Sequence, residues 1–216
     1  MNVADLQTAI GTPADGKWGP ASRAAQLAHF ADPSPMKIST VEMQAIAERL
    51  GCTLKQLAAV AAVESSGDGF DRNGRPKILY ERHIFHRLTG GNFSPASFSR
   101  ANFGGYNEDS WAKLADAAGR NPDAAFSACS WGRFQVLGMH WKRLGYASAF
   151  ALASACIGDE VGHFDLLARF IEANGLADEL RRLSSRPEDC APFARAYNGP
   201  EFARFSYDKK LARAMG

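Results

Sequence analysis

The stretch Thr53-Leu-Lys-Gln-Leu-Ala-Ala-Val-Ala-Ala-Val-Glu64-Ser-Ser-Gly67 decides much of the fold, because it reads as one complete helix that ends on an acid. Thr53 and Gln56 have the spacing of a capping box, and Gly67 is a natural stop beyond the last turn. Apolar residues at helical spacing form a stripe that continues to Glu64, so the carboxylate belongs to the buried face. Burial and the negative end of the helix dipole both raise the pKa of such a carboxyl, as a general acid at neutral pH requires. The helix alone leaves open whether Glu64 is this acid or a solvated residue at a frayed end.

Helix signals continue along the rest of the chain, and strand alternation is almost absent. A second capping box at 39–42 opens a helix that ends before Gly51, and 77–85 reads as a short extended piece that turns helical. We therefore expect a mostly α protein with at most a small β-hairpin, placed near the loop that follows Glu64. Further helices are expected at 108–118, 122–129, 134–143, 148–156, 159–174, 176–184, 187–197 and 207–215.

Composition excludes several broad classes of protein. The 216 residues suit one domain, or one domain with a small appendage, and a net charge of +2 gives no support for nucleic-acid binding. The four cysteines lie far apart without a CxxC pair, so their spacing predicts no zinc knuckle. A secretory signal and an apolar run of membrane-spanning length are both missing from the sequence. We expect a monomer that is cytoplasmic on synthesis, without stable membrane association.

Three short segments, taken together, resemble the signature motifs of the goose-type lysozyme and soluble lytic transglycosylase superfamily. They are Glu64-Ser65, Gly132-Arg-Phe-Gln135 and Ala196-Tyr-Asn-Gly199. In that superfamily a Glu-Ser ends a helix, a Gly-x-x-Gln opens another, and an Ala-Tyr-Asn-x-Gly segment closes the cleft. The resemblance implies that Glu64 is the catalytic acid and that Gln135, Tyr197 and Asn198 bind the sugar. The third segment lacks one residue before its glycine, and the second has Arg-Phe where small or apolar residues are usual, which puts the geometry of sugar binding in doubt.

A closer resemblance is to the N-acetylmuramidase domain of modular phage endolysins of Gram-negative hosts. It covers residues 38–216 and depends most on Gly74-Arg-Pro-Lys-Ile-Leu-Tyr-Glu-Arg-His-Ile-Phe85, together with the motifs above. The resemblance implies a lysozyme-like helical fold, no cofactor, and peptidoglycan glycan strands as substrate. The bond cut would be the β-1,4 linkage between N-acetylmuramic acid and N-acetylglucosamine, with Glu64 as general acid.

The second carboxylate of such a reaction is expected to be Glu81, with Asp71 as the other candidate. The competing interpretation of Glu81 is a structural ion pair with Arg75, Arg82 or Arg87. For stacking on a sugar ring, Tyr197 is the first candidate among the aromatic residues and Trp131 the second.

Residues 1–32 resemble part of the three-helix peptidoglycan-binding domain. A Leu-Gln helix is followed by the turn Asp15-Gly-Lys-Trp-Gly-Pro20 and an Ala-rich helix. A segment of this length can hardly bury a core of its own. It either binds the wall weakly while docked on the domain at 38–216 or is a structural remnant.

Three other functions stay open at this point. Lytic transglycosylation would form 1,6-anhydromuramyl products and needs no second carboxylate. A zinc-dependent amidase would use His83 and His86, which lie three residues apart, although the sequence has no HExxH motif. A wall-binding protein without enzymatic activity is supported only by the segment 1–32.

An endolysin made without a signal sequence would act on the cell wall after release through a membrane lesion made by another protein.

Overall fold

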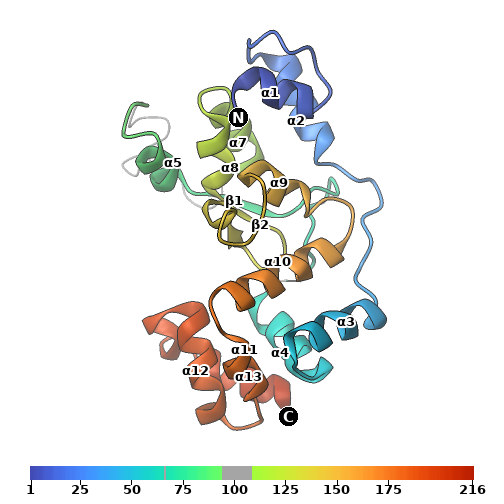
Figure 1. Ribbon diagram of the computed structural model, residues 1–216, viewed down its shortest axis with the longest axis vertical. Coiled ribbons are helices and arrows are strands. Elements are labelled where there is room, and N and C mark those ends of the chain that lie inside the picture. The colour runs from blue at the N-terminus through green and yellow to red at the C-terminus, as the bar shows by residue number, and fades with distance from the viewer. Residues whose placement is uncertain (66, 94–108) are drawn as a thin grey trace. The chain divides into compact units, whose positions relative to one another are not determined.

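The protein is mostly helical, with one small sheet (Figure 1). The computed structural model describes residues 1–65, 67–93 and 109–216. Its chain divides into two compact units: unit 1 comprises Met1–Pro35 and Phe70–Gly158, and unit 2 comprises Met36–Gly69 and Asp159–Gly216. Within the described ranges, no helix has both the length and the apolar composition that crossing a membrane requires.

Unit 2 is built from helices whose ends are fixed by local hydrogen bonds. The side chains of Ser39 and Thr53 accept from the backbone N–H groups of Glu42 and Gln56, so both predicted capping boxes are confirmed. The helices of this unit are α3 (Thr40–Leu50), α4 (Leu54–Glu64), α10 (Glu160–Ala173), α11 (Ala177–Arg181), α12 (Pro187–Asn198), the 3-10 helix η3 (Pro200–Ala203) and α13 (Tyr207–Met215).

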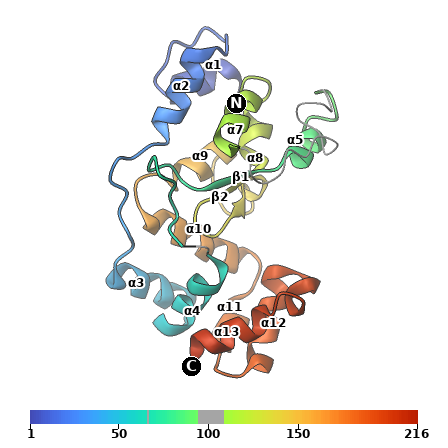
Figure 2. The same cartoon turned by 180° about the vertical axis from the view of Figure 1, so that it is seen from behind.

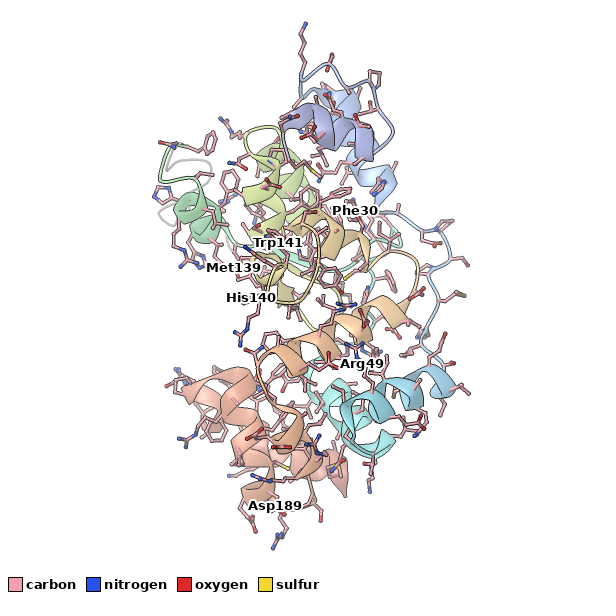
Figure 3. The ribbon with its side chains drawn as sticks, viewed as in Figure 1. Phe30, Arg49, Met139, His140, Trp141 and Asp189 are labelled. Carbon is pink, nitrogen blue, oxygen red and sulfur yellow. The ribbon has the colours of Figure 1, made fainter. Side chains whose placement is uncertain are left out.

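Packing in unit 2 brings the end of the chain against α4. Helix α13 lies beside both α12 and α4, as the two opposite views show (Figures 1 and 2). Helix α3 packs on α10, where the guanidinium of Arg49 donates to Asp165 at 2.6 Å and to both carboxylate oxygens of Glu172 at 2.6 and 2.8 Å (Figure 3). The core of the unit includes Leu57, Val60, Phe164, Leu167, Phe193 and Leu211, all fully buried.

Unit 1 contains the sheet. Strands β1 (Ile78–Tyr80), β2 (Cys129–Trp131) and β3 (Val136–Leu137) form an antiparallel sheet in the order β1-β2-β3, with Leu79 opposite Ser130 and Ser130 opposite Leu137. The helices of this unit are α1 (Val3–Ala9), α2 (Pro20–His29), α5 (Arg82–Leu88), α7 (Ser110–Ala118), α8 (Pro122–Ser127), η2 (Gly138–His140) and α9 (Ala149–Ser154).

An aromatic cluster forms the core of unit 1. Phe30, which follows α2, is fully buried, and its ring centroid lies 5.1 Å from that of Trp111 and 5.7 Å from that of Trp131 (Figure 3). The indole of Trp131 stacks on Phe126 at 5.8 Å and donates to the carbonyl of the same residue at 3.1 Å. Because Trp131 has no exposed surface, the prediction that it stacks on a sugar ring is wrong.

The N-terminal helices of unit 1 are held by a network around Gln7 and by the indole of Trp18. The buried amide of Gln7 donates to Asp15, Ser22 and the carbonyl of Lys17 at 3.0–3.1 Å, and so fixes the turn between α1 and α2. The Trp18 Nε1 donates to the carbonyl of Ala115 in α7 at 2.7 Å. The segment is therefore attached to the body of unit 1 by specific contacts.

Most of the predicted elements are confirmed, including the mostly α class and the extended-then-helical piece at 77–85. The helix predicted at 108–118 begins at Ser110, and Glu108 lies outside the described residues. The predicted helices that follow are observed, except for the one at 134–143.

That helix is wrong, because its residues form a turn, β3 and η2. Gly132 and Gln135 both have positive φ (68° and 52°), a conformation that cannot continue a right-handed helix. The hairpin expected in the loop after Glu64 is reduced there to a single bridge between Phe70 and Pro76. The strands of the sheet come from later in the chain.

Candidate active site

Glu64 is the last residue of α4, as the sequence predicts. Its neighbour Ser65 has an extended backbone, and the Ser65 hydroxyl donates to the carbonyl of Ala61 at 2.5 Å. The serine thereby satisfies one of the carbonyls that a helix end leaves without a partner. The Glu64 side chain is only partly accessible and starts from the apolar face of the helix, where Leu57 and Ala61 are buried.

The partner of Glu64 comes from a distant part of the chain. Asn198, the last residue of α12, donates from Nδ2 to Oε1 of Glu64 at 2.9 Å. Gly199, with φ 80°, ends α12 at this point and lets the chain turn away. The side-chain amide thus faces the carboxyl and fixes its orientation.

Tyr197 lies next to this pair and is held by two rings. It stacks on Phe193 with centroids 5.5 Å apart and meets Phe170 edge-on at 5.3 Å. Burial and the nearby charge of Glu64 raise the pKa of the Tyr197 hydroxyl. The phenol therefore stays neutral and available as a hydrogen-bond donor.

The surroundings of Glu64 raise its pKa to about 7, and burial is the cause. The hydrogen bond from Asn198 and the charge of Lys210 act in the opposite direction. A carboxyl with this pKa is largely protonated just below neutral pH and can still release its proton, which is the property of a general acid. Glu64, Tyr197 and Asn198 thus form one group within unit 2.

Two residues that were not singled out from the sequence belong to the same group. Tyr207 and Lys210 lie in α13, and the Lys210 Nζ is 5.0 Å from the centroid of the Tyr207 ring. Burial and the charge of Glu64 raise the pKa of Tyr207. No motif marks these residues in the sequence, because their proximity to Glu64 arises from helix packing alone.

Glu81 belongs to unit 1 and precedes α5. Its backbone N–H donates to the carbonyl of Ala128 at 2.8 Å, which anchors it beside β2. The carboxylate is 3.5 Å from Nδ1 of His83, and its charge contributes to the raised pKa of the buried Cys129. The side chain is 21% exposed, so it remains accessible to water.

Asp71, the other candidate for the second carboxylate, is occupied within its own turn. Its carboxylate accepts from the guanidinium of Arg75 at 2.9 and 3.0 Å and from the backbone N–H groups of Asn73 and Arg75 at 2.8 and 3.1 Å. The same ion pair engages Arg75, one of the three arginines considered as partners of Glu81. These contacts give Asp71 a structural role in the turn.

Gln135 lies in unit 1, in the turn that joins β2 to β3, and its side chain is exposed. The amide Nε2 donates to the carbonyl of Gly132 at 2.8 Å and to that of Lys77 at 3.3 Å. Gly132 itself donates to the Lys77 carbonyl at 2.8 Å. The Gly-x-x-Gln segment therefore closes a tight turn against the sheet and does not open a helix.

His83 and His86, the pair considered for zinc, do not belong to a group of metal-ligating side chains among the described residues. Across residues 1–65, 67–93 and 109–216 we find no group of three or more His, Cys, Asp or Glu side chains placed to hold a metal ion.

Comparison with known proteins adds a family and a relative of known structure. The family model for N-acetylmuramidase matches residues 53–216. Among solved structures, the crystal structure of Burkholderia AP3 phage endolysin is similar, with a TM-score of 0.74 and 37% sequence identity. The similarity covers 99% of this chain and 83% of that one. The comparison with curated proteins gives no match.

Proposed function

The chain belongs to the N-acetylmuramidase family of peptidoglycan-degrading enzymes, and from this premise we propose that it is a phage endolysin with Glu64 as its general acid. The bond cut is the β-1,4 linkage between N-acetylmuramic acid and N-acetylglucosamine. The enzyme reaches this substrate after release from the cytoplasm in which it is made.

The observation that carries the proposal is the environment of Glu64. Burial raises the pKa of its carboxyl to about 7, and Asn198 holds one oxygen at 2.9 Å. The acid protonates the bridging oxygen as the bond from that oxygen to C1 breaks, and the electron pair of the bond stays on the leaving sugar. Tyr197 and Gln135 are proposed to bind sugar groups through their polar ends.

Glu81 is proposed as the second carboxylate, which accepts a proton from the attacking water or stabilises the positive charge at C1. Its partial exposure beside β2 suits contact with water. The anomeric form of the first product, followed by NMR, distinguishes inversion from retention.

Substitution of the proposed acid gives the decisive test. Glu64→Gln keeps the shape of the side chain and an oxygen for Asn198, but its amide cannot transfer a proton to the bridging oxygen at neutral pH. We expect the rate of glycan cleavage to fall by about 10²–10⁴-fold with the fold retained, as measured on purified peptidoglycan. Glu48→Gln, an exposed change in α3 with the same loss of charge, is the matched control and should leave the rate unchanged. Activity of Glu64→Gln close to that of the unmodified enzyme would refute the proposal.

Product masses then identify the reaction. Reducing muramic acid ends are expected for hydrolysis. Products lighter by one water, with 1,6-anhydro ends, would instead establish lytic transglycosylation by the same acid. Release of stem peptides from intact glycan strands would point to an amidase and would contradict both.

A further inference from the structure

Glu160, the first residue of α10, is a buried acid that the proposed reaction does not use. The residue is only 2% exposed, and its helix packs on α3 within unit 2 (Figures 1 and 2). A carboxylate that is removed from water is costly unless hydrogen-bond donors or positive charge surround it. The N-terminal end of α10 offers the positive end of the helix dipole, which favours an acid there, and backbone donors supply the rest.

These donors come from two segments that are distant in the chain. Oε2 of Glu160 accepts from the backbone N–H of Ile38 at 3.4 Å, and Oε1 accepts from that of Gly69 at 3.4 Å. The backbone N–H of Glu160 donates to the carbonyl of Met36 at 2.9 Å, and Asp159 forms a parallel bridge with Met36. Glu160 thus joins both segments to the start of α10.

The same segments contain the points at which the chain passes between the two units. Unit 2 consists of Met36–Gly69 and Asp159–Gly216. Met36 and Gly69, the two ends of its first segment, both bond to Glu160, which is the second residue of the other segment. Glu160 therefore holds together, within unit 2, the three chain ends at which this unit is joined to unit 1.

One of these chain ends follows the proposed acid. Gly69 is buried and comes soon after Glu64, the last residue of α4. Between them, Asp68 forms an ion pair with Lys37 at 3.1 Å, but the two side chains are 64% and 75% exposed. An ion pair this exposed contributes little to stability, whereas a hydrogen bond to a buried carboxylate is stronger. The bond to Glu160 is therefore the firmer anchor of the segment that leaves Glu64.

We propose that Glu160 is a positioning residue for the reaction: its carboxylate anchors the segment that follows Glu64 to the start of α10, and so fixes where the acid lies. This inference rests on the proposed role of Glu64 as general acid. Glu160 acts through the backbone and not on the sugar. A displacement of about 1 Å at a reacting group can lower a rate by about 10²-fold, so loss of the anchor is expected to slow cleavage.

Glu160→Gln tests the proposal in the full chain, because the amide keeps the shape of the carboxylate but has only one oxygen. Either Ile38 or Gly69 then has its backbone N–H opposite an NH₂ group and loses its acceptor. We expect hydrogen exchange of that amide, followed by NMR, to become faster by about 10- to 100-fold. On soluble glycan strands, kcat should fall by about 10- to 100-fold, with a much smaller change in KM.

Two changes in the same helix are the matched controls. Glu172→Gln removes a carboxylate that binds Arg49 of α3, and Ile171→Val removes one methylene from the buried core of unit 2. Ile171→Val should lower Tm, and both variants should leave kcat and the exchange of the Ile38 and Gly69 amides unchanged. A loss of activity caused by lower stability alone would appear in Ile171→Val as well.

The unmodified enzyme provides a measurement that does not require a variant to fold. Its Ile38 and Gly69 amides should be protected from exchange, and free exchange of Gly69 would overturn the inference. A Glu160→Gln enzyme with unchanged kcat would overturn it too. A full rate in Glu64→Gln would instead overturn the proposed function, and the exchange of the two amides would still report whether Glu160 anchors this segment.

Discussion

At the scale of single residues, Glu64 shows how a functional acid costs stability. An exposed carboxyl would have a pKa near the reference value of 4.5, and burial moves it to about 7 in the folded protein. The folded state therefore binds a proton more tightly than the unfolded state does. Between these two pKa values, the free energy of unfolding decreases as the pH rises, and the full cost is present above about pH 7.

Glu64→Gln should for this reason be more stable than the unmodified protein at alkaline pH. The neutral amide carries no buried charge, so we expect a gain of about 1–3 kcal/mol in the free energy of unfolding at about pH 8. The gain should vanish at about pH 4, where Glu64 is protonated in both states. Urea unfolding at the two pH values measures it, and an equal effect at both would show that the charge of Glu64 is not the cause.

At the scale of elements, the contact between Trp18 and α7 decides how the N-terminal helices attach. Gly119 caps α7 with φ −66°, a backbone conformation that any residue adopts. A Cβ at this position would nevertheless lie 2.4 Å from the Trp18 ring. Glycine is therefore required at position 119 because the Trp18 indole lies so close, and not because of the backbone conformation.

Gly119→Ala should destabilise unit 1 by about 1–3 kcal/mol, because the Trp18 ring must move and its bond to Ala115 is strained or lost. In a Trp18→Ala background the same change should be neutral or slightly stabilising, since the obstacle is gone and alanine restricts the unfolded chain. Thermal unfolding of the four proteins in this double-mutant cycle measures the coupling. Additive effects would contradict the proposed collision.

At the scale of the whole molecule, residues 1–32 contribute to the core of unit 1. Phe30 is fully buried among aromatic residues from α7, α8, β2 and α9. A wall-binding module on a flexible linker would not place a side chain there. We therefore propose that the segment is a structural part of the catalytic chain, whether or not it also contacts the wall.

A chain that lacks residues 1–32 should consequently lose stability throughout unit 1. Removal of a buried phenylalanine alone costs about 3–5 kcal/mol, so Phe30→Ala is expected to lower Tm strongly, whereas Phe205→Ala, at a side chain that is 54% exposed, should change Tm little. Calorimetry of the truncated chain and the two variants measures this. Unchanged Tm values for the truncated chain would show that the segment is separable.

The candidate site was only partly predictable from the sequence. Glu64 could be placed because its helix begins and ends on local signals, a capping box and an apolar stripe, that act over a few residues. The turn at Gln135 could not be predicted in this way. Gly132 and Gln135 adopt a left-handed backbone conformation with positive φ, although the sequence around them otherwise suits a helix. The burial of Trp131 could not be predicted from the sequence either. An aromatic residue beside a motif gives the same sequence pattern whether its side chain packs in the core or contacts a ligand.

The sequence by itself determined the mostly α class, the start and end of most helices, and the helix that ends on the acid Glu64. Hydrogen bonds and apolar periodicity along one segment specify these features. Only the tertiary structure decided the chemistry of that acid. Asn198 lies 134 residues from Glu64 in the chain, and Lys210 lies farther still. A pKa depends on burial and on the charges and donors that surround a group in space, and folding brings those together from segments that carry no mutual signal in the sequence.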